Sequence, residues 1–140
     1  MWKVMALLFM LATAGCGEAY RYLKSGEVSW ALKHELRDRK AEKIELAKLT
    51  KFQWDEFFLF GPYESKEEVC GHLTLSGVEC QNEIKDESTD DAEMLMVFRL
   101  KGKIVHTEMH IRWHGDFEPD AVQRFTPITA VFLVSPEGKS

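Results

Sequence analysis

The 140-residue chain has no excess of basic residues, since Lys and Arg total 18 against 23 Asp and Glu, a formal net charge of −5. A protein that neutralises nucleic-acid phosphates normally has the opposite balance. The chain also lacks a G-x-S-x-G elbow, a P-loop, a G-x-G-x-x-G turn and an H-E-x-x-H helix. We therefore expect no nucleic-acid partner, no cofactor and no catalytic residue, and the sequence favours a non-enzymatic protein over an enzyme.

No apolar run is long enough to cross a bilayer. Residues 4–14 are uncharged and follow Lys3, but about 11 residues fall short of the roughly 20 that a transmembrane helix needs. A short apolar segment behind a positive charge is typical of a signal peptide. Residues 1–15 are therefore predicted to be an export signal and not a permanent membrane span.

Two cleavage patterns overlap at the end of this segment. Residues 12–14, Ala-Thr-Ala, fit an ordinary signal peptidase. Residues 11–16, Leu-Ala-Thr-Ala-Gly-Cys, resemble the lipobox of bacterial lipoproteins, although Thr13 stands where that pattern prefers Leu. The resemblance implies that Cys16 becomes the acylated, palmitate-bearing N-terminus of a membrane-anchored protein that faces the periplasm. Because Gly17 is not the Asp that retains lipoproteins in the inner membrane, it implies the outer membrane of a Gram-negative cell.

Cysteines are few, and their spacing excludes two common sites. The chain has three cysteines, Cys16, Cys70 and Cys80. Their spacing gives no C-x-x-C redox motif, and they are too few to supply the ligands of a zinc knuckle. If Cys16 is acylated, an even pair remains, and an oxidising periplasm favours a disulfide that closes a loop of about ten residues. The alternative is that Cys70 and Cys80 are small buried hydrophobic residues.

Two helices are predicted from local patterns. Apolar residues recur four apart from Val28 to Leu36 with charged residues between them, which predicts an amphipathic helix over 27–39. Ser65 and Glu68 form a capping box, in which each side chain can bind the backbone N–H of the other residue. A helix of about two turns should follow this box.

Strands are predicted in the centre of the chain. Both faces of 54–60 are apolar, as in a buried central strand. Segments 94–100 and 103–113 are two apolar, alternating runs that flank Lys101-Gly102, which predicts a hairpin. Two further segments, 41–50 and 128–134, are interpreted as strands, and the acidic segment 81–93 as an exposed loop.

These elements predict one α+β domain over 27–140, in which an antiparallel sheet of about four or five strands carries one or two helices on one face. Residues 16–26 would then form the lipidated N-terminus and a tether to the domain.

The strand and turn around residue 60 also carry a family resemblance. Trp54, Asp55 and 60–63 (Phe-Gly-Pro-Tyr) form a W-D-x-x-x-x-F-G-P-Y pattern, and 97–105 continuing to 114–117 looks similar to the same group. On these residues the chain resembles a family of small, uncharacterised exported proteins and lipoproteins of bacteria. The resemblance implies location and fold, and it implies no biochemical activity.

One strand carries the candidate ligands. In an extended 103–113 segment, His106, Glu108 and His110 point to the same side, about 6.5 to 7 Å apart from one to the next. Imidazole and carboxylate groups at that spacing could converge on zinc or copper. The alternative is a solvent-facing strand whose charges discourage edge-to-edge pairing.

The sequence thus predicts a cell-envelope lipoprotein, attached to the membrane by lipid on Cys16, whose domain is a binding or interaction module with another envelope protein as the candidate partner. The alternative is a periplasmic metal- or small-ligand-binding protein that uses the His106, Glu108 and His110 face.

Overall fold

The computed structural model describes residues 25–118 and 123–135. Their helices and strands form a single α+β domain with two antiparallel sheets, which confirms the predicted fold class. The helices are α3 (Glu27–Lys33), α4 (Lys66–His72) and α5 (Gly77–Glu83), and the strands are β1 (Lys43–Glu45), β2 (Glu56–Phe60), β3 (Glu93–Leu100), β4 (Lys103–Ile111), β5 (Gln123–Phe125) and β6 (Val131–Leu133).

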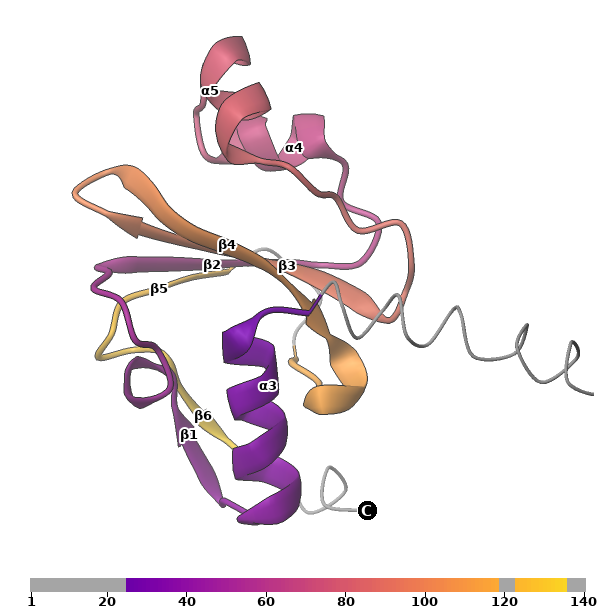
Figure 1. The fold of residues 1–140 in the computed structure, drawn as a ribbon, viewed down its shortest axis with the longest axis vertical. Helices are drawn as coiled ribbons and strands as arrows, with labels where there is room; N and C mark the ends of the chain where they lie inside the picture. The colour runs from indigo at the N-terminus through magenta and orange to yellow at the C-terminus, as the bar shows by residue number, and fades with distance from the viewer. Residues whose placement is uncertain (1–24, 119–122, 136–140) are drawn as a thin grey trace, which may run out of the picture.

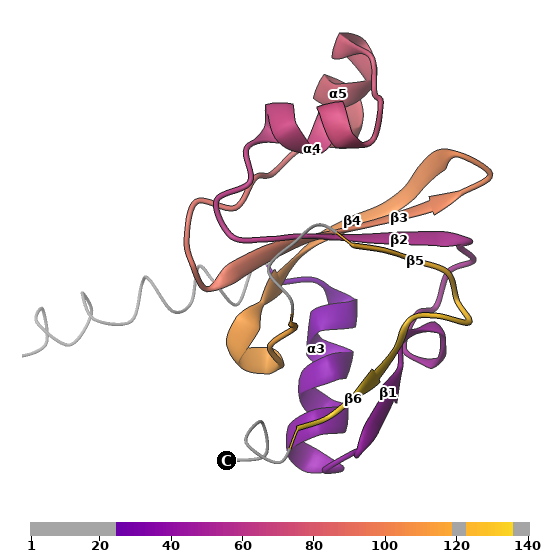
Figure 2. The same cartoon turned by 180° about the vertical axis from the view of Figure 1, so that it is seen from behind.

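The helices cover both faces of the main sheet, whereas the sequence predicted helices on one face only. The four-stranded sheet has the order β4-β3-β2-β5, and β1 and β6 form a separate two-stranded sheet. Figure 1 shows α4 and α5 above the main sheet and α3 with β1 and β6 below it, and the view from behind in Figure 2 agrees. The prediction was wrong because it placed the core on one side of the sheet, although the central strand has two apolar faces.

Strand β2 shows this double burial directly. Phe57 and Leu59 belong to the core beneath the sheet, with Val28 and Leu32 of α3, while Phe58 and neighbouring side chains pack beneath α4 on the other side. β2 pairs with β3 on one side and β5 on the other, both antiparallel. The prediction of a central buried strand is therefore confirmed.

The β3–β4 hairpin is also confirmed. Leu100 pairs with Lys103, and Lys101 and Gly102 between them both have positive φ, 51° and 78°. Two positive φ values define the tight turn whose twist matches that of the flanking strands.

Two short helices, α4 and α5, are joined by a disulfide. The predicted Ser65–Glu68 capping box starts α4, and a second box, Ser76–Glu79, starts α5. Cys70 and Cys80 form the disulfide predicted from the sequence, with Cα atoms 5.6 Å apart. The exposed loop predicted over 81–93 is wrong at both ends, because the second box starts a helix: α5 extends to Glu83, and β3 starts at buried Glu93.

The amphipathic helix predicted over 27–39 is α3 followed by one π-helical turn, His34–Asp38. Val28 and Leu32 are its buried apolar residues, and Leu36 packs against the same core while partly exposed. Of the strand expected over 41–50 only β1 is extended, and of that expected over 128–134 only β6.

The predicted signal segment, lipobox and Cys16 lie outside the described residues. Within 25–118 and 123–135, no helix is long and apolar enough to span a bilayer.

Candidate functional site

The polar face of β4 is buried beneath α3, so the expectation of a solvent-facing strand is wrong. Glu108 is 7% exposed and His110 is fully buried, and the His106 side chain is 25% exposed. β4 ends at Ile111, and His114, fully buried, lies in the 3-10 turn that follows. Sequence alternation separated the two faces of the strand correctly but could not say which of them α3 would cover.

The Glu108 carboxylate caps the N-terminus of α3. Its Oε1 accepts the backbone N–H of Val28 and its Oε2 that of Ser29, both at 3.0 Å. The N-cap residue of α3, Gly26, has no side chain to bind these donors, which every helix start leaves unsatisfied. A carboxylate here also suits the partial positive charge of the helix end. Glu108 therefore attaches α3 to the sheet.

Glycine at position 26 is required by this contact. A Cβ atom on Gly26 would overlap the side chain of Glu108. His106 completes the arrangement, because its Nε2 lies 2.7 Å from Oε1 of Glu108. Its ring stacks on Phe52 at a centroid distance of 4.4 Å. His106 and Glu108 are thus brought together as the sequence predicted, but as part of a helix cap.

Ser29 joins His110 of β4 to His114 of the turn that follows it. Its Oγ lies 2.9 Å from Nδ1 of His110 and 2.9 Å from Nδ1 of His114. It also accepts the backbone N–H of Ile111 at 3.2 Å. Nε2 of His110 donates to the carbonyl oxygen of Gly115 at 2.6 Å.

These contacts determine which ring nitrogen of each histidine carries the proton. A neutral imidazole has one N–H and one acceptor nitrogen, so His110, which donates from Nε2, accepts the Ser29 hydroxyl proton at Nδ1. The hydroxyl has only one proton, and His114 must therefore donate from Nδ1 to Ser29. The Ser29 oxygen then donates one hydrogen bond and accepts two, which uses all of its capacity.

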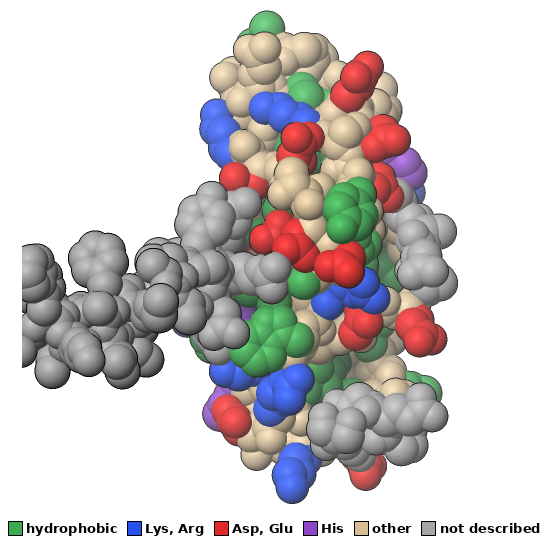
Figure 3. Space-filling model, turned by 90° about the vertical axis from the view of Figure 1, so that its right-hand side faces the viewer, with side chains coloured by type: hydrophobic (Ala, Val, Ile, Leu, Met, Phe, Trp, Pro, Cys, Tyr) green, Lys and Arg blue, Asp and Glu red, His purple; other side chains and the backbone are tan. Residues whose placement is uncertain are grey.

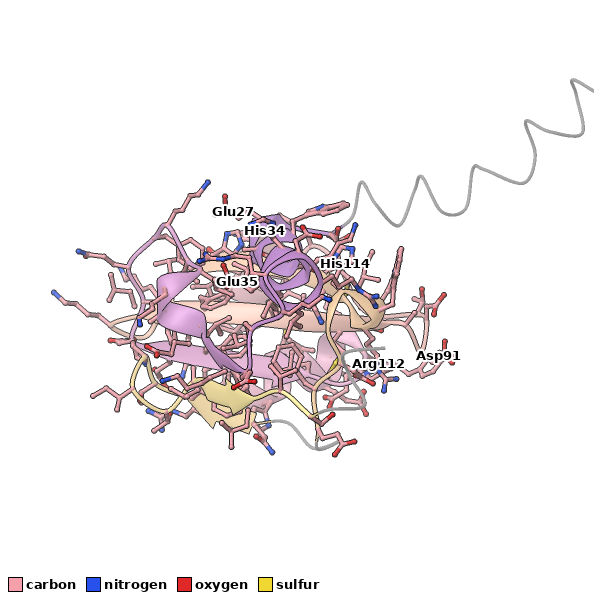
Figure 4. All side chains as sticks on the ribbon, turned by 90° about the horizontal axis from the view of Figure 1, so that it is seen from below. Glu27, His34, Glu35, Asp91, Arg112 and His114 are labelled. Carbon is pink, nitrogen blue, oxygen red and sulfur yellow. A yellow bond between two sulfur atoms is a disulfide. The ribbon has the colours of Figure 1, made fainter. Side chains whose placement is uncertain are left out.

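Burial keeps both histidines neutral. It lowers the pKa of His110 to about 4, and nearby His114 acts in the same direction, against the opposing effects of the Gly115 carbonyl, Glu108 and Asp116. Burial and the charge of Lys33 also lower the pKa of His114. Figure 4 shows His114 beside α3, whereas Arg112 and Asp91 lie farther out, towards the edge of the molecule.

A metal site is not formed by the described residues, where no group of three or more His, Cys, Asp or Glu side chains is arranged to hold an ion. Both ring nitrogens of His110 are hydrogen-bonded, to Ser29 and Gly115. The Glu108 carboxylate accepts two backbone N–H groups and contacts His106. Coordination would require these bonds to break.

We therefore expect zinc to leave the melting temperature of the purified protein unchanged. Zinc at a hundred times its Kd would stabilise a folded protein with such a site by about 2.7 kcal/mol, which a thermal melt detects easily. A rise in melting temperature that disappears in His106→Ala would restore the metal hypothesis.

A hollow of about 220 Å³ lies beside β4, and the residues that line it include His106, Glu108, Lys85 and Asp86. Ser25, which forms a parallel bridge with Met109, also lines it. The volume of this hollow is below the roughly 300 to 1,000 Å³ of most small-molecule sites.

No family model, curated protein or solved structure matches this chain. What the site can do is therefore judged from its own geometry. The residues that sequence reasoning missed are Gly26, Ser29 and Gly115, which give no motif signal, because each acts through a contact with a residue about 80 positions away or through a backbone atom.

Proposed function

We propose that this chain is an exported lipoprotein of the bacterial cell envelope, held to the outer membrane by acyl chains on Cys16, whose domain acts by binding and not by catalysis. The observation that carries the proposal is the Cys70–Cys80 disulfide. Structural disulfides persist in oxidising compartments such as the periplasm and are rare in the cytosol. A third cysteine that follows an apolar N-terminal segment suits acylation.

Binding is favoured over catalysis because the most promising catalytic groups are used to build the fold. A general base must reach a substrate proton within hydrogen-bonding distance. His110 instead bonds Ser29 and Gly115, and Glu108 bonds the start of α3. These groups fix a helix on a sheet and thereby shape the surface outside it.

The lipid anchor is tested by labelling cells that produce the full-length chain with a palmitate analogue. We expect label on the wild-type protein, none on Cys16→Ser, and full label on the matched control Cys70→Ser with Cys80→Ser. Mass spectrometry of the mature N-terminus gives a second measurement. Label that survives Cys16→Ser, or a mature chain that begins at Gly15, would refute the anchor and favour ordinary signal cleavage.

The second candidate is a small polar ligand in the hollow beside β4. The observation that favours it is that four ionisable residues, His106, Glu108, Lys85 and Asp86, line one hollow, and the small volume of the hollow places this candidate second. A compound that raises the melting temperature of the wild type but not of His106→Ala would support this candidate.

A further inference from the structure

Two exposed tryptophans lie together on the surface near the start of the described chain. Trp30 of α3 is 36% exposed and Trp113 of the turn after β4 is 48% exposed. With Lys33 and Arg37 they form what we call the tryptophan patch. In Figure 3, hydrophobic and basic side chains gather next to one another on the lower half of the face shown. Contiguous exposed apolar surface, especially with a polar rim, marks protein or membrane interaction sites.

The patch is built on one side of a helix. Trp30, Lys33 and Arg37 are three and four residues apart, so they share the face of the helix opposite buried Leu32. Lys33 Nζ lies 4.8 Å from the ring centroid of Trp30 and 5.9 Å from that of Trp113. One cation thus lies between two indole rings, an attractive arrangement.

The rings are held in position from behind and from the side. Buried His114 contacts Trp30 at a centroid distance of 4.7 Å and Trp113 at 5.5 Å. Arg37 donates to the backbone carbonyl of Trp113 through Nε and Nη2, at 3.2 and 2.6 Å. A surface that is already ordered loses less conformational entropy on binding. The buried histidine network therefore supports the patch.

The patch also lies close to the predicted anchor along the chain. Trp30 is five residues after Ser25, and Cys16 is nine residues before Ser25. Nine residues span at most about 32 Å, however they are arranged. A lipid on Cys16 would therefore keep the start of α3 within about 32 Å of the bilayer surface.

We propose that the tryptophan patch docks on the headgroup layer of the membrane that holds the anchor. Tryptophan is enriched at membrane–water interfaces, where its apolar ring and N–H suit the headgroup level. Lys33 and Arg37 supply cations for lipid phosphate, on a protein whose total charge is −5. The inference rests on the proposed lipid anchor, and it adds that the domain lies against the membrane with one fixed face.

The test uses the full-length lipidated protein in vesicles of phosphatidylethanolamine and phosphatidylglycerol, with or without bromine on the acyl chains near the headgroup. Bromine quenches indole emission at short range. After removal of residues 1–15 the chain has three tryptophans, and Trp54 is 7% exposed with its Nε1 bound to Thr50. We expect brominated lipid to quench up to about two thirds of the emission, because two of the three rings would lie at headgroup depth.

Trp30→Phe with Trp113→Phe is the matched variant, and it should show no quenching because only Trp54 remains. Lys33→Gln with Arg37→Gln should reduce quenching while the protein still floats with the vesicles. Flotation separates the two proposals, since a protein that does not float lacks the anchor. A floating protein whose emission is unquenched would overturn the docking proposal and leave the patch for a protein partner.

Discussion

Replacing Glu108 with alanine is expected to lower the free energy of unfolding by about 3 kcal/mol, the largest loss we expect from a single polar substitution in this domain. The change removes the acceptor of the Val28 and Ser29 N–H groups and the partner of His106. Buried donors without partners cost about 1 to 3 kcal/mol each. Urea unfolding followed by circular dichroism measures the loss.

Two further variants separate the cap from a general charge effect. Glu108→Gln keeps the shape and one acceptor oxygen, but its NH₂ group meets a backbone N–H, so its stability should fall between those of wild type and Glu108→Ala. Glu27→Ala removes an exposed acidic residue from the same helix turn, where a charge is worth about 1 kcal/mol or less. Equal losses in Glu27→Ala and Glu108→Ala would contradict the capping role.

Features that depend on neighbouring residues could be predicted from the sequence. The Lys101-Gly102 turn, the Ser65–Glu68 box and the two apolar faces of β2 each follow from a few adjacent positions. Ser76 and Glu79 form an equally clear box, so the start of α5 is also encoded by a few adjacent positions.

The candidate site could be predicted only in part, because its contacts are long-range. Alternation placed His106, Glu108 and His110 on one side of a strand, but nothing local shows that α3 covers that side. Ser29 on α3 is 81 positions from His110, and a serine next to apolar residues gives no signal of a buried hydrogen bond. The helix start lacks a capping side chain at Gly26 because its cap comes from Glu108.

Acid should destabilise the protein through His110 well before its carboxylates are protonated. The folded-state pKa of His110 is lowered to about 4 from 6.5, so the unfolded chain binds more protons between these values. The stabilisation is therefore complete above about pH 6.5 and is lost as the pH falls towards 4. Protonation would also place a third donor on the Ser29 oxygen, which already accepts two hydrogen bonds.

Between pH 7 and pH 5 we expect the free energy of unfolding to fall by about 2 kcal/mol from His110 alone, with a contribution of the same sign from His114, whose pKa is also lowered. Hydrogen bonds lower the pKa values of Glu45, Glu68 and Glu79 from 4.5, so the effects of these carboxylates appear mainly at lower pH.

Urea unfolding between pH 7 and pH 5 measures this dependence. The free energy of unfolding of His110→Gln, which is less stable than the wild type at pH 7, should change less with pH. An unchanged slope in His110→Gln would show that the proton is taken up elsewhere, and the shared Ser29 hydroxyl would then not control acid stability.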